Sequence, residues 1–266
     1  MSSWGLAYVI GNVIIQRIIR KGIAFPRDIL MRHIIRLFIF CTAVSCFSAG
    51  FSLAQQMDGE KLPMYGQPGI VRPENLKKVD EGFVRDATLK FGNRLAASRA
   101  IAAQGWEAVR NRNPVLAMQR FNQAWLLNPK NYQAFWGFGA VLSEQKKLAE
   151  ALEQLDTARE LVDDTSQMTP LLTDVGTVHS EYAASLPKDK QLERAHHFVV
   201  ANQCFADGLD RDPNFAAGWR EWAISLYRQE RYSEAWLRAQ RAKELNAEPF
   251  PPEFIRDLQI KMPNPK

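Results

Sequence analysis

Apolar side chains recur at helical spacing over most of the chain after residue 73. Val79, Phe83, Ala87 and Phe91, for example, are four positions apart, which places them on one face of an α-helix. No stretch alternates apolar and polar residues with a period of two, so we expect almost no β-strand. The predicted helices cover about 74–91, 95–111, 114–128, 169–185, 190–210, 215–229, 232–245 and 252–260, with a further pair inside 132–165.

The helical part contains a repeat of 34 residues. One set of positions returns 34 residues later in a second set: Gly105, Ala117, Phe121, Ala124 and Pro129 are followed by Gly139, Ala151, Leu155, Ala158 and Asp163. A third set keeps the internal spacing at Ala223, Ala235, Ala239 and Ala242. Small residues at these offsets let two antiparallel helices cross closely. A fixed period of this length predicts stacked helix pairs, in which no pair can bury its apolar face alone.

These three sets resemble the tetratricopeptide repeat family, most closely between Gly105 and Asn131. The resemblance implies an all-α fold, a right-handed superhelical α-solenoid of antiparallel helix pairs. The third repeat departs most from the family pattern, because it is longer than the 34-residue period and its first helix is out of register. Within a helical domain of 74–262, the repeats would cover about 98–131, 132–165, 166–215 and 216–249, and a helix at about 252–260 would cap the last one.

The family resemblance also implies a binding surface. First helices of such repeats line a concave groove, and second helices form the convex back. The positions carried onto this groove are Arg99, Trp106, Arg110, Gln133, Trp136, Glu144, Arg220, Tyr227 and Arg228. Exposed aromatic and arginine side chains are favoured as anchors in protein interfaces. The alternative is that the tryptophans belong to the core and that the arginines form a solvated face, paired with Glu107, Glu144 or Glu221.

The first part of the chain has the layout of an export signal. Residues 31–54 begin with two arginines, continue through an uncharged apolar run, and end in small residues before Gln55, which predicts a cleaved signal peptide. The alternatives are an uncleaved anchor helix over 37–56 or lipidation at Cys46. Residues 1–30 are interpreted as a mis-assigned start or an upstream extension, with Met31 as the true first residue.

A flexible linker is predicted between the signal and the helices. Residues 55–73 contain three prolines and three glycines and few residues that could form a periodic face, which is typical of an extended tether. Met64-Tyr65 and Ile70-Val71 are its local apolar spots, which could dock onto the helical body.

Charge and cysteine content change the interpretation of the partners. Residues 1–54 hold six of the 34 basic residues and one of the 29 acidic residues, so the remainder holds 28 of each. That balance argues against nucleic acid as a partner. Cys204 is the only cysteine after residue 54 and lies in an apolar helical stretch, so we expect it to be buried rather than in a disulfide.

No catalytic or metal-binding pattern is found. His196 and His197 are adjacent on a predicted helix and therefore cannot chelate one ion together, and no phosphate-binding loop or nucleophile with its base is present. We therefore expect no enzyme activity, no cofactor and no metal ion. The expected function is an exported, periplasmic protein-binding scaffold with an unknown protein or peptide partner. The alternatives are a scaffold or assembly factor of an envelope or secretion complex, tethered to the inner or outer membrane, and a regulatory domain of an enzyme.

Overall fold

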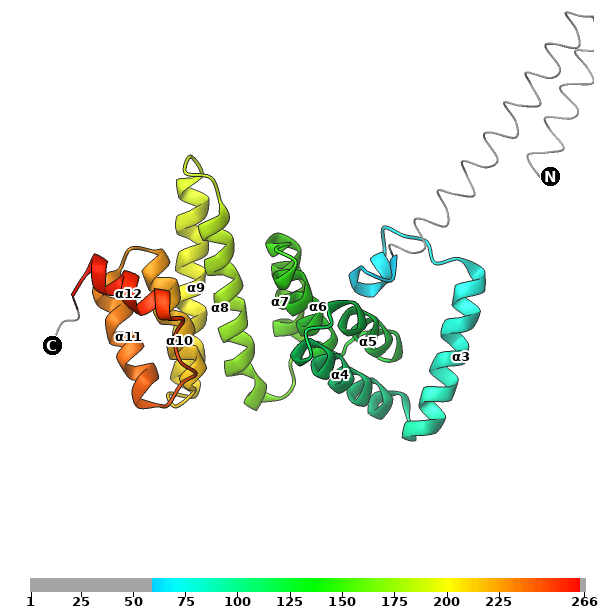
Figure 1. The fold of residues 1–266 in the computed structure, drawn as a ribbon. Coiled ribbons are helices and arrows are strands. Elements are labelled where there is room, and N and C mark those ends of the chain that lie inside the picture. Colours follow the sequence, from blue (N-terminus) through cyan, green and yellow to red (C-terminus); the bar gives the residue numbers. More distant parts are fainter. Residues whose placement is uncertain (1–58, 264–266) are drawn as a thin grey trace, which may run out of the picture. The chain divides into compact units, whose positions relative to one another are not determined.

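A computed structural model describes residues 59–263. The expectations for residues 1–58, which include the start at Met31, the signal peptide or anchor and the lipidation of Cys46, lie outside this range. The described residues form ten α-helices and two short 3-10 helices and contain no strand, so the all-α prediction is confirmed for them (Figure 1).

The helix boundaries follow the predictions to within a residue or two. The elements are η1 (Pro63–Gly66), α3 (Glu74–Phe91), α4 (Arg94–Arg110), α5 (Pro114–Leu127), α6 (Tyr132–Glu144), α7 (Leu148–Leu161), η2 (Thr165–Gln167), α8 (Met168–Ser185), α9 (Gln191–Arg211), α10 (Ala216–Arg228), α11 (Tyr232–Glu244) and α12 (Pro252–Lys261).

Asparagine side chains begin three successive helices. The side-chain oxygens of Asn93, Asn113 and Asn131 accept hydrogen bonds from backbone N–H groups of the first turns of α4, α5 and α6. These caps satisfy donors that have no partner inside the helix. Pro114 occupies the first position of α5, where its missing N–H costs nothing.

Helices pack in consecutive pairs. The closest packing joins α4 to α5, α6 to α7, α8 to α9 and α10 to α11, and each pair also contacts the next (Figure 1). The first helices contact one another in order, α4 with α6, α6 with α8 and α8 with α10. Consequently side chains from four different first helices can contribute to one surface.

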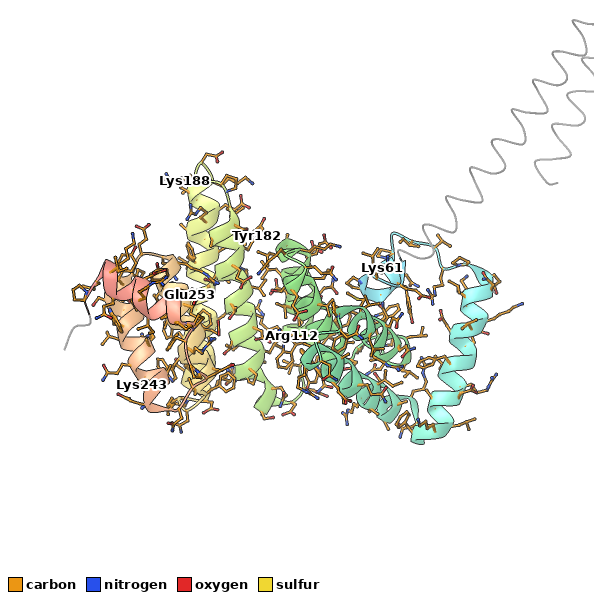
Figure 2. All side chains as sticks on the ribbon, in the orientation of Figure 1. Lys61, Arg112, Tyr182, Lys188, Lys243 and Glu253 are labelled. Carbon is orange, nitrogen blue, oxygen red and sulfur yellow. The ribbon has the colours of Figure 1, made fainter. Side chains whose placement is uncertain are left out.

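The turns inside three of these pairs share a backbone conformation. Arg112, Lys146 and Glu230 all have positive φ, at 54°, 60° and 61°, and each lies seven residues after Gly105, Gly139 or Ala223 of the sequence repeat (Figure 2 labels Arg112). Residues other than glycine rarely adopt this left-handed conformation. Its recurrence at equivalent positions shows that the repeat extends to the turn geometry.

The small residues of the repeat make room for one ring. Phe121 is fully buried, and a Cβ added at Gly137 would lie 2.2 Å from its Cζ, while one added at Gly105 would lie 2.5 Å from its Cε1. Ala117 and Ala124, on the same helix as Phe121, are also fully buried. Glycines on α4 and α6 therefore let both helices approach the Phe121 ring directly.

The third pair is longer than its neighbours. Helices α8 and α9 have 18 and 21 residues, whereas α10 and α11 have 13 each, so the extra length of the third repeat lies largely in its helices. Lys188 marks the turn between them (Figure 2). Near this end, Leu192 and Val199 of α9 are 89% and 66% exposed.

Part of the predicted linker is folded onto the helices. Asn122 of α5 accepts a hydrogen bond from the Tyr65 N–H at 3.1 Å and donates to the carbonyls of Glu60 and Leu62. Arg72 lies over the Tyr65 ring, 3.7 Å from its centroid, and forms a bidentate ion pair with Asp80 of α3. In this part of the predicted linker, the backbone of residues 60, 62 and 65 is thus held by one buried amide, and Arg72 is held by Asp80.

The C-terminal helix covers α10 and α11 as expected. Phe254 and Leu258 of α12 are buried in a cluster with Trp236 and Leu226, and the Trp236 indole donates to the Met262 carbonyl at 2.9 Å. Burial of these apolar side chains gives the last helix pair the neighbour that it would otherwise lack.

Candidate functional site

All nine predicted groove residues lie on first helices of their pairs. Arg99, Trp106 and Arg110 are on α4, Gln133, Trp136 and Glu144 are on α6, and Arg220, Tyr227 and Arg228 are on α10. They differ in how much of each side chain a partner could reach. Arg99, Arg110 and Glu144 are exposed, Trp136 is only 8% exposed, and the other five are partly buried.

The two tryptophans form part of the core. Trp106 packs edge-on against Trp136 and against Phe121, with ring centroids 5.3 and 5.4 Å apart. The Trp136 indole N–H then donates to Oδ2 of Asp174 on α8 at 2.7 Å. Trp136 is therefore a packing residue that orients a carboxylate, rather than a free aromatic anchor.

Asp174 is the most unusual group on the first helices. Its side chain is exposed, but the surrounding helices displace part of the water around the carboxyl and so raise its pKa to about 6. The Trp136 hydrogen bond lowers this pKa in part, and the charge of Glu221 on α10 raises it. Among residues 59–263, no cation pairs with Asp174. Oδ2 of Asp174 is thus held by the Trp136 N–H, whereas no side chain of the described residues hydrogen-bonds to Oδ1.

Glu221 has an internal partner. Burial raises its pKa, and the neighbouring guanidinium of Arg220, which hydrogen-bonds to it, opposes that shift. Arg220 also donates to the carbonyl of Glu248 and lies over the Phe250 ring. Arg220 therefore connects α10 to the segment before α12, and its guanidinium is already paired with the Glu221 carboxylate.

Charged side chains also connect the α6–α7 turn, α8 and α10. Glu181 of α8 accepts a hydrogen bond from Lys146 Nζ at 2.9 Å and lies 3.6 Å from the Arg228 guanidinium, which also donates to Ser180 Oγ.

Tyr227 packs against Tyr232 and Phe254, so it belongs to the C-terminal core.

Arg99 and Arg110 remain available to a partner. Neither guanidinium forms a hydrogen bond or an ion pair in the described part of the chain.

Sequence reasoning missed Asp174 for two reasons. The third repeat was out of register, and Gly176 supplies the register, since a Cβ there would lie 3.0 Å from the Phe205 ring, as one at Gly105 would meet Phe121. Aligning Gly176 with Ala223 then places Asp174 at the position of Glu221, which lies in a repeat already in register and was not among the predicted groove residues either. The register alone therefore does not identify Asp174; its contact with Trp136 does.

The histidines form a separate contact. His179 Nδ1 and His197 Nδ1 are 2.8 Å apart, and the burial of His179, followed by the charge of His197, lowers the pKa of His179 to about 4. No group of three potential metal ligands occurs among residues 59–263. Cys204 is buried, as predicted, and burial raises the pKa of its thiol to about 11.

Within the described range, no helix combines the length and apolar character needed to cross a membrane. Comparisons with protein-family models and with curated proteins found no match to this chain. The resemblance to tetratricopeptide repeats therefore rests on the residues quoted above.

The side chains of α4, α6, α8 and α10 around Asp174 are called the first-helix surface below.

Proposed function

We propose that the protein is a non-enzymatic, tetratricopeptide-like scaffold that binds a protein partner on the first-helix surface. The repeated helix pairs and their shared turn conformation support a solenoid. In such an array, the first helices together present one continuous surface, which a peptide or helix can contact at several points.

The observation that carries this proposal is the uncompensated carboxylate of Asp174. Asp174 is exposed, but the neighbouring helices displace part of the water around its carboxylate and no described cation compensates its charge, so the charged form costs some folding free energy. Such local conflicts are concentrated at functional sites. A partner that brings a lysine or arginine side chain to Asp174 would remove this cost on binding. Exposed Arg99 and Arg110 on α4 offer the opposite charge, which would orient the bound segment.

The export-signal pattern of residues 31–54 supports a location outside the cytoplasm, with the periplasm as the expected compartment. The second candidate, a scaffold tethered to a membrane, is favoured by the same apolar run if it stays uncleaved. Mass determination of the N-terminus from purified membranes and soluble extracts distinguishes these two candidates.

Site-specific photocrosslinking in cells tests the binding surface. A photoreactive amino acid is placed at Arg99 or Glu144, exposed on first helices, and at the controls Gln119 or Glu153, exposed on second helices. We expect an adduct with a discrete partner from the first-helix positions only, and Asp174→Lys should abolish it. Adducts from the second-helix positions alone, or from no position, would refute the proposal.

A further inference from the structure

A second surface lies beside the lengthened part of α9 and borders the first-helix surface at Arg228. A pocket of about 370 Å³ is lined by Arg194, Phe198, Val199 and Asn202 of α9, by Arg228 at the end of α10, and by Gln229, Glu230 and Arg231 of the α10–α11 turn. Pockets of this volume are within the range that binds small groups or side chains. It is an open depression rather than a closed cavity.

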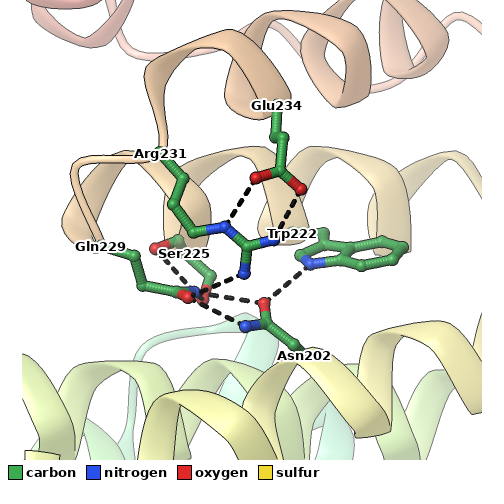
Figure 3. Close-up of polar contacts among 6 residues, drawn as sticks. All are labelled: Asn202, Trp222, Ser225, Gln229, Arg231 and Glu234. Carbon is green, nitrogen blue, oxygen red and sulfur yellow. Dashed lines mark hydrogen bonds and ion pairs between the residues drawn. The ribbon is translucent and has the colours of Figure 1, made fainter. Parts of the chain in front are cut away.

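The floor of this pocket is fixed by side-chain hydrogen bonds (Figure 3). Asn202 donates to Gln229 Oε1 at 2.8 Å and accepts from the Trp222 indole N–H at 2.9 Å, while Gln229 donates to Asn202 and to Ser225 Oγ. These contacts join α9 to the end of α10. The pocket is therefore preformed, so binding would cost little ordering of its floor.

Two of the three guanidinium groups at the pocket have carboxylate partners. Arg231 forms a bidentate ion pair with Glu234, and Arg228 lies beside Glu181. The Arg194 guanidinium, in contrast, forms no hydrogen bond or ion pair among residues 59–263. Arg194 is thus the cation of this pocket that can accept a new carboxylate.

The wall beside Arg194 is apolar and uncovered. Val199 is 66% exposed, and Phe198 is partly buried. This part of α9 extends beyond the shorter α10 and α11, so no described element covers it. An aliphatic group placed against Val199 and Phe198 would be removed from water at a short distance from the Arg194 guanidinium.

We propose that this pocket binds an acidic side chain next to an aliphatic one, within a segment of a partner protein. The carboxylate would pair with Arg194, and the aliphatic side chain would contact Val199 and Phe198. The pocket is open rather than enclosed, so an internal segment can cross it without a chain end. The proposed contacts are to Arg194, Phe198 and Val199 of the second helix α9, so the proposal does not depend on the function proposed for the first-helix surface.

Selection from a displayed library of random peptides tests this proposal on the full-length chain. We expect enriched sequences in which aspartate or glutamate adjoins leucine, isoleucine or valine. Synthetic versions of these peptides should bind at least about tenfold more weakly to Arg194→Glu, since a charge-assisted contact is involved. The matched control is Arg211→Glu, which changes an exposed arginine of the same helix outside the pocket and should bind normally.

A second variant, Val199→Asp, should also weaken binding by placing a like charge beside the ligand carboxylate. Both substitutions alter side chains without polar partners, so unchanged circular dichroism is expected. Peptides that lack acidic residues, that bind Arg194→Glu as well as the wild type, or that need a free terminal carboxylate would overturn the proposal. Absence of enrichment over an uncoated surface would overturn it as well.

Discussion

Asp174→Asn is expected to stabilise the protein at pH 8 but not at pH 4. The asparagine keeps a carbonyl oxygen for the Trp136 N–H and removes the charge. The pKa of Asp174 is about 6 in the folded protein, compared with a value near 3.9 in an unfolded chain. A difference of about two units corresponds to about 3 kcal/mol for a fully shielded group. Because this side chain is exposed, solvent screening reduces the expected gain to about 1 kcal/mol.

The sign follows from proton binding. An acid whose folded pKa is raised costs stability above that pKa, and the cost disappears as the pH falls from about 6 to about 4. The free energy of unfolding of the wild type and of Asp174→Asn should therefore be measured by urea denaturation at pH 8 and at pH 4. His179 titrates in both proteins, so its contribution cancels in the difference. Equal effects of the substitution at both pH values, or destabilisation at pH 8, would refute the reasoning.

Three further predictions concern the fold. In thermal unfolding, Gly137→Ala should destabilise the protein by about 1–3 kcal/mol, because its Cβ would clash with the buried Phe121 ring. The control Gly82→Ala, whose Cβ would have no atom closer than 3.8 Å, should stabilise it by up to about 1 kcal/mol. His179, whose pKa is lowered from 6.5 to about 4, should cause stability to fall as pH drops through this interval, and His179→Gln should flatten that slope in urea titrations. Asn122→Ala should accelerate hydrogen exchange at the Tyr65 amide and proteolysis within 59–72 while leaving exchange in α6 unchanged; equal acceleration in α6 would show a global effect instead.

The helices could be predicted because their determinants are local. The spacing of Gly105, Ala117 and Phe121 reports the crossing of two neighbouring helices, and asparagine caps report where helices begin. The apolar spot Met64-Tyr65 indicated that the linker could dock, but the residue that binds it could not be predicted in the same way. The docking depends on Asn122, which lies more than 50 residues away from Tyr65 in sequence, and no local pattern identifies such a partner.

The first-helix surface was predicted less well than the fold. The exposure of Arg99 and Arg110 agrees with their assignment, because the exposure of each side chain depends only on which face of its own helix it occupies. The buried contact of Trp136 and the contacts of Arg220 depend on how α6 and α10 pack against other segments. The spacing of residues along a single helix does not report that packing. Asp174 was missed because its position, equivalent to that of Glu221, is not among those that the family resemblance carries onto the groove.

The position at which the chain reaches the folded body has a mechanical consequence. Residues 59–66 are attached to α5, the second helix of its pair, by the three hydrogen bonds of Asn122. Tension on the chain before residue 59 is therefore resisted first at α5. The surface of α4, α6, α8 and α10, on which we propose that a partner binds, does not bear this load directly, so a pull from the N-terminal side would reach α5 before it reached that surface.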